Sequence, residues 1–261
     1  MIRVGIGGWV FAPWRGEFYP KGLPLAQELA FASGKLGAIE INATFYRTQT
    51  PASFRKWADE TPADFVFSVK GPQFATNRKV LAEAGSSIER FFGSGVLELK
   101  GKLGPILWQM APHKKFEPDD FAAFLALLPP KVDGRAIRHV VEVRHQSFVT
   151  ADFIALLRKS SVAVVLVQSE KHPLIADVTS DFIYARLQGT SEKVATGYPP
   201  NELDVWAKRA QSWAAGGAPA DLPTIGGGAP AKAPRDVFIY MISGAKVRAP
   251  AAAMALIERL G

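Results

Sequence analysis

Residues 138–168 read RHVVEVRHQSFVTADFIALLRKSSVAVVLVQ, and this stretch decides the fold. It opens with the run RHVVEVRH from Arg138, continues through a segment of helical periodicity at 151–159, and closes with VAVVLVQ from Val162. Two β-branched, apolar runs with a helix between them are typical of a strand–helix–strand unit, in which the strands pair in parallel. The stretch therefore predicts a parallel sheet covered by helices.

The same alternation extends in both directions along the chain. Six further β-branched or aromatic runs are IRVGIGGW from Ile2, AIEINATFY from Ala38, DFVFSVKG from Asp64, GPILWQM from Gly104, FIYARLQG from Phe182 and DVFIYMIS from Asp236. Helix-like segments lie among them at 25–36, 52–60, 118–128, 202–214 and 249–260. Eight strands in 261 residues predict one α/β domain over residues 1–261, a (β/α)8 TIM barrel with a parallel eight-stranded barrel.

A doubly wound open sheet is the alternative architecture, and it normally carries a glycine fingerprint after its first strand. Gly5, Gly7 and Gly8 do not fit GxGxxG, and Trp9 follows them instead of a helix start. We therefore favour the closed barrel. The Gly-, Ala- and Pro-rich segment 216–234 precedes the last strand, so we expect it to be a flexible loop on the N-terminal face, away from the site.

Composition excludes several kinds of chemistry. The chain has no cysteine, which excludes disulfides, thiolate nucleophiles and cysteine-ligated metal centres. It starts at Met1 without an apolar leader, and no apolar run approaches the roughly 20 residues of a membrane-spanning helix, so we expect a cytoplasmic protein with no membrane role. The net charge of +7 suits an anionic partner, although the Lys and Arg residues are scattered and not clustered.

Polar side chains recur near the C-terminal ends of the predicted strands, where TIM-barrel active sites lie. Alternation along a strand sends every second side chain into the barrel. The polar positions that this rule groups are Glu40, Asn42 and Thr44; Ser68 and Lys70; Glu142 and Arg144; Arg186 and Gln188; and, on two further strands, Gln109 and Gln168. Because buried charges are costly unless paired, the set is interpreted as a pre-organised site or as a network of ion pairs that fills the barrel.

Aromatic residues crowd the first two strand-to-helix connections. Trp9 and Tyr46 lie beside polar positions and are expected to contact a ligand, whereas Phe18 and Phe45 are expected to cap the core. Of the four histidines, His145 follows a strand closely enough to face the pocket. No HxH or HExxH spacing supports a metal site, so the cofactor is left unknown and a divalent metal at the carboxylates is left open.

Several motifs in combination resemble the DUF72 family, also called YecE-like. They are GGWVFAPWRGEFYP from Gly7, EINATFYR from Glu40, the TP-F-F-VK pattern from Thr61 to Lys70, EVRH from Glu142, YARLQG from Tyr184 and YP-ELDVWA from Tyr198. The resemblance runs nearly end to end. It implies a TIM barrel related in shape to the endonuclease-IV and xylose-isomerase group, and it implies no established activity.

The resemblance also singles out positions in this chain. They are Trp9, Glu40, Asn42, Phe45, Tyr46, Arg47, Lys70, Gln109, Glu142, Arg144, His145 and Arg186. The chain departs from the family pattern at Gln188 and Asn77, where histidines are common, and at 240–243, where YMIS replaces YFNN. These departures remove hydrogen-bonding groups from the mouth, which is consistent with either a divergent specificity or a lost activity.

Two functional hypotheses follow. In the first, the protein is a hydrolase or isomerase for a phosphorylated or sugar-containing substrate, with Glu40, Glu142 and Lys70 catalytic. The substrate would then contact Trp9, Asn42, Tyr46, Gln109, Arg144, His145, Arg186 and Gln188. In the alternative, the pocket binds a nucleic acid or an anionic metabolite without catalysis. The sequence leaves the oligomeric state undetermined.

Overall fold

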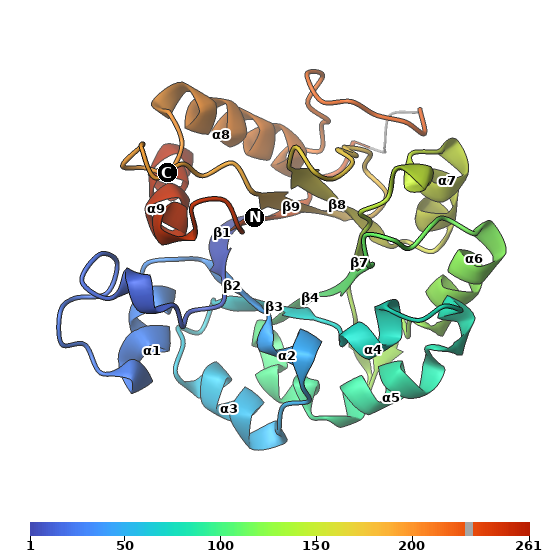
Figure 1. Ribbon diagram of the computed structural model, residues 1–261, viewed down its shortest axis with the longest axis horizontal. Coiled ribbons are helices and arrows are strands. Elements are labelled where there is room, and N and C mark those ends of the chain that lie inside the picture. Colours follow the sequence, from blue (N-terminus) through green and yellow to red (C-terminus); the bar gives the residue numbers. More distant parts are fainter. Residues whose placement is uncertain (228–231) are drawn as a thin grey trace.

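Eight parallel strands close into a barrel in the computed structural model, which describes residues 1–227 and 232–261 (Figure 1). The strands follow one another around the barrel in chain order, and β10 pairs with β1 to close it. Their bounds are β1 Ile2–Gly7, β2 Ala38–Ile41, β3 Val66–Lys70, β4 Leu103–Gln109, β7 His139–Glu142, β8 Ala163–Gln168, β9 Phe182–Leu187 and β10 Asp236–Met241. Seven of them fall within a predicted run, and β4 begins one residue before the run from Gly104, so the predicted TIM barrel is confirmed.

Helices surround the barrel, as Figure 1 shows. They are α1 Glu28–Ser33, α2 Ala43–Tyr46, α3 Pro51–Asp59, α4 Gln73–Thr76, α5 Gly85–Gly93, α6 Pro118–Leu127, α7 Ala151–Lys159, α8 Pro200–Ala214 and α9 Ala249–Leu260. The start of α7 is set by Thr150, whose hydroxyl accepts a hydrogen bond from the backbone N–H of Phe153 at 3.2 Å. The helix predicted at 25–36 is shorter, because residues 25–27 form a 3₁₀ turn before α1.

Short elements complete the chain between the helices. The 3₁₀ turns are Ala12–Trp14, Leu25–Gln27, Leu81–Glu83, Val96–Lys102, Gln146–Phe148 and Lys246–Arg248. The strands β5 (Lys131–Val132) and β6 (Arg135–Ala136) form an antiparallel pair outside the barrel. Residues 169–181 join β8 to β9, are all described, and contain no helix. No helix of the described residues is long and apolar enough to cross a membrane.

Alternation divides the strand side chains into two sets. One set fills the space between barrel and helices, and the other forms a separate apolar cluster inside the barrel. The interior cluster comprises Ala38, Val66, Leu107, Val140, Ala163, Val165, Val167, Phe182, Tyr184, Phe238, Tyr240 and Ile242. Strand β1 adds Gly5 and Gly7, and a Cβ at Gly5 would lie 1.9 Å from the carbonyl oxygen of Ala38. Glycine is therefore required there by the close approach of β1 and β2.

The Gly/Ala/Pro-rich segment, predicted to be a flexible loop on the N-terminal face, follows α8 and precedes β10 in the chain. Residues 228–231 of this segment lie outside the described residues. Its earlier part is anchored, because the carboxylate of Asp177 accepts hydrogen bonds from the backbone N–H groups of Ile225 and Gly226 at 2.8 and 2.9 Å. Arg158 donates to the carbonyl oxygen of Gly227 at 2.9 Å. These contacts hold residues 225–227 against α7 and the β8–β9 connection.

Candidate functional site

The centre of the barrel holds an arginine between two carboxylates. Arg186, from β9, donates to both oxygens of Glu40 on β2, with Nη2–Oε1 and Nε–Oε2 distances of 3.0 and 3.1 Å. Its Nη1 donates to Oε2 of Glu142 on β7. Both carboxylates are 0% exposed. The planar guanidinium thus spans the barrel and ties together three strands that are not neighbours.

Glu142 is held in its ionised form. Its Oε1 accepts hydrogen bonds from Nε of Arg144 at 2.7 Å and from Nε2 of Gln109 at 2.9 Å. Burial alone would raise the pKa of Glu142, but Arg186 and Arg144 outweigh it and lower the pKa to about 2. Burial likewise opposes the charge of Arg186, yet Glu142 and Glu40 raise its pKa above the ordinary value. Glu142 and Arg186 are therefore both charged at neutral pH.

Lys70 has a different environment from Arg186. Its Nζ donates to Oε1 of Gln109 at 3.0 Å and lies 4.0 Å from the centre of the Phe45 ring. Among the described residues, no carboxylate lies within ion-pair distance of this ammonium, and the residue Lys70 is 4% exposed. Burial first, and then the charge of Arg186, lower the pKa of Lys70 from 10.5 to about 8.

Tyrosines support the charged cluster from below. The hydroxyl of Tyr184, two residues before Arg186 on β9, donates to Oε2 of Glu40 at 2.8 Å. Tyr240 on β10 and Ser68 on β3 share a hydrogen bond of 2.6 Å between their hydroxyls. Burial and the nearby Glu40 raise the pKa of Tyr184 well above its ordinary value, so its hydroxyl stays a donor. Each of these buried polar groups therefore has a partner.

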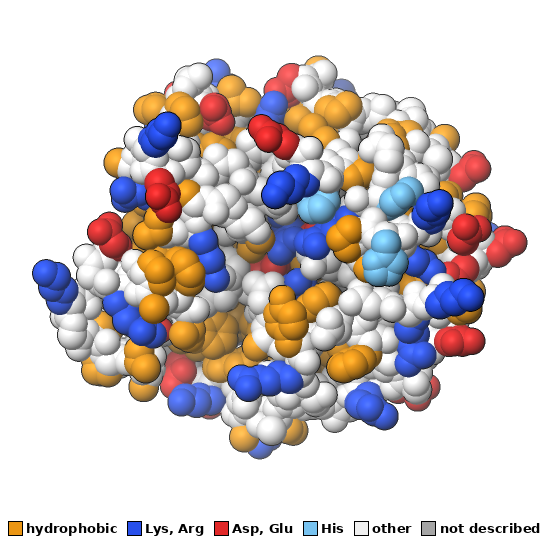
Figure 2. Space-filling model, in the orientation of Figure 1, with side chains coloured by type: hydrophobic (Ala, Val, Ile, Leu, Met, Phe, Trp, Pro, Cys, Tyr) orange, Lys and Arg blue, Asp and Glu red, His pale blue; other side chains and the backbone are white. Residues whose placement is uncertain are grey.

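A cavity of about 540 Å³ opens above the cluster, at the C-terminal ends of the strands, and is called the central cavity here. This is an ordinary size for a small-molecule site. Its polar and aromatic lining includes Trp9, Asn42, Tyr46, Lys70, Gln109, Arg144, Arg186, Ser243 and Lys246. Figure 2 shows Lys and Arg side chains gathered in the central hollow of this face.

The structure brings most of the predicted site residues together, in two layers. Seven of them line the central cavity: Trp9, Asn42, Tyr46, Lys70, Gln109, Arg144 and Arg186. Glu40 and Glu142 lie beneath it, without exposed surface. His145 and Gln188 do not line the central cavity. The Nδ1 of His145 accepts a hydrogen bond from the backbone N–H of Ser147 at 3.1 Å. Gln188 lines a neighbouring cavity.

Two further expectations are decided by the geometry. The placement of Gln168 inside the barrel was wrong, because Ala163, Val165 and Val167 hold the interior positions of β8. Gln168 therefore faces outward, where its Oε1 accepts a hydrogen bond from the hydroxyl of Tyr198 at 2.6 Å. Phe45, expected to cap the core, instead lies against the ammonium of Lys70.

Sequence reasoning missed three side chains of this region. Lys246 lines the central cavity from the turn after β10, with Nζ 4.6 Å from the centre of the Phe11 ring. His172, in the β8–β9 connection, lies close enough to Arg144 and Glu142 for their charges to influence its pKa, which burial lowers. Tyr184 could have been found, because residues two apart on one strand share a face and Arg186 was already assigned to the interior.

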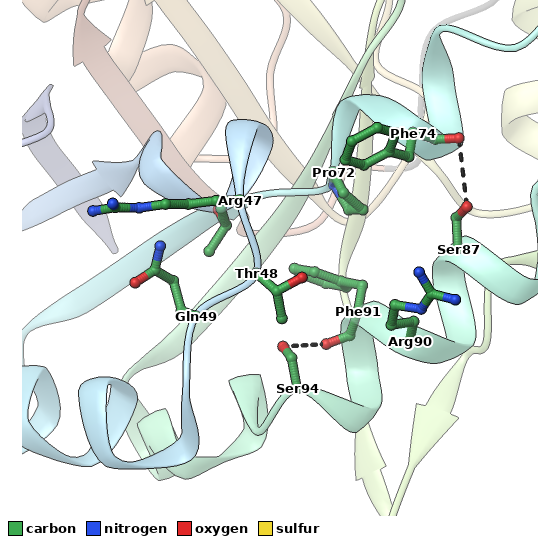
Figure 3. A pocket seen from close by; sticks show the side chains of 10 residues that line it. Arg47, Thr48, Gln49, Pro72, Phe74, Ser87, Arg90, Phe91 and Ser94 are labelled. Atoms are coloured by element: carbon green, nitrogen blue, oxygen red, sulfur yellow. Dashed lines mark hydrogen bonds between the residues drawn. The ribbon is translucent and has the colours of Figure 1, made fainter.

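A second, smaller cavity of about 90 Å³ lies across α2 from the central cavity and is called the side cavity. Ala43 and Tyr46 of α2 line the central cavity, whereas Thr44 lines the side cavity. Figure 3 shows the rings of Phe74 and Phe91 among its lining residues, with hydrogen bonds from Ser87 to Phe74 and from Ser94 to Phe91. Its exposed lining is mostly apolar, unlike that of the central cavity.

Metal ligands are not grouped in the part of the chain that the structure describes. No three His, Asp or Glu side chains in residues 1–227 and 232–261 are placed to hold a metal ion. The oxygens of Glu40 and Glu142 are taken by Arg186, Arg144, Gln109 and Tyr184. The two carboxylates are therefore arranged as partners of cations within the protein.

Fold and site together define a TIM-barrel protein with a cationic cavity at the C-terminal face of its strands. The family model described as "Protein of unknown function DUF72" matches residues 3–261. The chain belongs to the DUF72 family, as its motifs indicated.

Known proteins resemble this chain to different extents. The UPF0759 protein YunF of Bacillus subtilis is 29% identical over 117 residues, which span 43% of this chain and 40% of that relative. The crystal structure of a DUF72 family protein from Thermotoga maritima has a TM-score of 0.76 and 21% identity, and the match covers 100% of this chain and 99% of the other. The structure of SacUVDE matches with a TM-score of 0.55 and 10% identity, covering 99% of each chain, which fits an endonuclease-IV-like shape.

Proposed function

We propose that this protein is an enzyme of the hydrolase or isomerase type whose central cavity binds a small phosphorylated or sugar-like substrate. One observation carries the proposal: of the described residues that line the central cavity, four are cationic and none is acidic. The carboxylates that balance them are buried below. An anion in the cavity would thus meet positive charge without displacing an ion pair of Glu40.

Each cavity residue has a role in this proposal. Arg144, Arg186 and Lys246 attract the anionic group, and Lys70 contacts the reacting part of the substrate as its catalytic residue. The ring of Trp9 offers an apolar wall, because it is fixed by Trp57 with ring centres 5.3 Å apart. Glu40 and Glu142 act as positioning residues, since they hold Arg186 and Arg144 without lining the cavity. Asn42, Tyr46 and Gln109 supply further polar contacts.

Isothermal titration calorimetry with inorganic phosphate and glycerol phosphate tests the binding step. We expect Arg144→Gln to weaken binding at least about tenfold, because this arginine lines the cavity and keeps donors free beyond its bond to Glu142. The matched control is Arg47→Gln, since Arg47 is exposed and does not line the central cavity. Equal affinity in wild type and Arg144→Gln, or no binding to the wild type at low ionic strength, would contradict the proposal.

Nucleic-acid binding is the second candidate, and exposed aromatic residues favour it. Tyr46 on α2 and Phe74 on α4 are 65% and 64% exposed, and Arg47 and Lys79 are exposed close to them in sequence. Rings beside cations suit single-stranded nucleic acid, with about 1–3 kcal/mol per stacked base. A fluorescent oligonucleotide should bind more weakly as salt rises, and Phe74→Ala should weaken it further. Absence of binding at low salt would remove this candidate.

A further inference from the structure

Lys70 is one of two lysines that line the central cavity, and among the described residues no carboxylate lies within ion-pair distance of its amine. It ends β3, where the strand points its side chain into the barrel mouth, and it lines the same cavity as Arg144 and Lys246. We propose that Lys70 forms an imine with the aldehyde or ketone carbon of a substrate whose anionic group these cations hold. The proposal rests on the function proposed above and adds to it a covalent step and a carbonyl-bearing substrate class.

The contacts of Lys70 leave the amine available. An ammonium has three N–H donors, and Gln109 accepts one of them at 3.0 Å. The ring of Phe45 covers another side at 4.0 Å. Gln109 is itself fixed, because its Nε2 donates to Glu142 at 2.9 Å. The lysine is therefore aimed by a neutral amide, whereas a carboxylate in that place would hold its proton.

Electrostatics act in the same direction as the contacts. Burial of the side chain and the positive charge of Arg186 lower the pKa of Lys70 to about 8, although Glu40 and Glu142 oppose the shift. At pH 7 about one amine in ten is then neutral, against fewer than about one in a thousand for an exposed lysine. A neutral amine carries the lone pair that attacks a carbonyl carbon.

The covalent step balances without an outside oxidant or reductant. The nitrogen lone pair of Lys70 forms a C–N bond while the carbonyl π electrons move to oxygen, and a proton passes from nitrogen to that oxygen. A second proton, taken up from the solvent, releases the oxygen as water, and the nitrogen lone pair forms the C=N bond. The resulting protonated imine draws electrons from the neighbouring carbon, which is the requirement for moving a hydrogen or cleaving a C–C bond beside the carbonyl.

The shape of the cavity is compatible with this attack. Gly7, the last residue of β1, and Gly8, which follows it, are among the residues that line the cavity. A Cβ at Gly7 would lie 2.5 Å from Cδ1 of Ile242 and 3.1 Å from Nδ2 of Asn42, which shows how close these groups already lie. Because Lys70, Arg144 and Lys246 line the same cavity, the proposed substrate has its carbonyl at Lys70 and its anionic end at the other two cations.

Reductive trapping tests the inference. The protein is incubated with glyceraldehyde phosphate and cyanoborohydride, and adducts are located by intact mass and peptide mapping. We expect one adduct per chain on Lys70, formed at least tenfold faster than on the exposed Lys35, and slowed by added inorganic phosphate. The trapping rate at Lys70 should rise with pH and level off above about 8. Labelling of Lys70 no faster than of Lys35 would overturn the inference.

Two variants and one binding measurement keep the outcomes distinct. Lys70→Arg retains the charge and should show no adduct at this position, whereas Lys35→Arg should leave labelling of Lys70 unchanged. Calorimetry with glycerol phosphate, which has no carbonyl, reports on the anion site alone. Binding of glycerol phosphate without trapping overturns the imine and supports the proposed function. Absence of glycerol phosphate binding overturns the proposed function itself.

Discussion

The two sides of the barrel mouth treat a buried cation in opposite ways. On the β9 side, Arg186 contacts two carboxylates that are 0% exposed. On the β3 side, Lys70 has an amide and an aromatic ring as its contacts. The first arrangement makes removal of the cation expensive, because two anions would lose their partner. The second leaves the Lys70 ammonium able to bind another group. The comparison therefore assigns Arg186 to maintaining the structure of the site and Lys70 to contact with a ligand.

Substitution of Arg186 should have the largest effect on stability. Arg186→Met leaves Glu40 and Glu142 buried without their shared partner, so we expect a loss of about 3–5 kcal/mol in the free energy of unfolding. Urea denaturation followed by circular dichroism measures it. The control is Arg144→Met, which removes an arginine with a 23% exposed side chain and a single carboxylate contact, and it should cost less. Equal losses of free energy of unfolding in Arg186→Met and Arg144→Met would contradict the expectation that Arg186 contributes more to stability.

Substitution of Tyr184 should have an intermediate effect. Tyr184→Phe removes the hydroxyl that donates to Glu40 at 2.8 Å, and a hydrogen bond to a charged group contributes about 1.5–3 kcal/mol. Thermal and urea unfolding should both report a loss in this range, with the native fold retained in the far-ultraviolet spectrum. A variant as stable as the wild type would show that Arg186 satisfies Glu40 alone.

Substitution of Tyr240 should cost less, because its partner is neutral. Tyr240→Phe leaves the hydroxyl of Ser68 without its 2.6 Å partner, and we expect a loss of about 1 kcal/mol. The double variant Tyr240→Phe with Ser68→Ala should recover part of that loss, since both polar groups are then absent. If the double variant loses more free energy of unfolding than the two single variants lose together, the shared hydrogen bond is not the source of the effect.

Substitution of Lys70 should have the smallest effect on stability and a large effect on binding. Lys70→Met replaces a buried ammonium that lacks a carboxylate partner by an apolar chain of similar shape, so the free energy of unfolding should fall by less than about 1 kcal/mol or should rise. Calorimetry should show weaker binding of glycerol phosphate. If Lys70→Met lost as much free energy of unfolding as Arg186→Met, the two buried cations would contribute equally to stability, which would contradict the comparison.

The pH dependence of stability tests whether Lys70 is a buried ammonium with a lowered pKa. The pKa of Lys70 is about 8 in the folded protein and 10.5 in its ordinary state, so the unfolded chain binds more protons between these values. Stability contributed by this residue therefore rises with pH across that window, and its burial penalty is fully present below pH 8. Unfolding of wild type and Lys70→Met, compared from pH 7 to pH 10, should show the wild type gaining relative to the variant. A constant difference would mean that Lys70 titrates as an exposed lysine.

Most of the fold was predictable from the sequence, because most of its strands and helices have a recognisable local sequence pattern. Each barrel strand is an apolar run, and α7 and α9 begin and end in clear periodic patterns. Three helices were not predicted. Two of them, α2 and α4, are four residues long and depend on their neighbours, and α5 begins with the sequence Gly-Ser-Ser, which favours a loop.

The sequence predicted which residues form the site, but not which of them contact one another. Alternation correctly placed Glu40, Lys70, Glu142 and Arg186 together near the C-terminal ends of the barrel strands. Which cation meets which carboxylate depends on the stagger of strands that are distant in sequence, and no local pattern encodes it. Gln168 shows the limit of the rule, since counting from the wrong interior residue of β8 sends the side chain to the opposite face.

The one-turn helix α2 has a mechanical consequence, because it is a partition only four residues long with a cavity on each side. The hydroxyl of Thr44 fixes that partition to β3, through a 2.7 Å hydrogen bond to the carbonyl oxygen of Lys70. The short helix between the two cavities is thus bonded directly to the backbone of the residue that carries the amine. Thr44, which lines the side cavity, therefore connects that cavity to the strand whose last residue, Lys70, lines the central cavity.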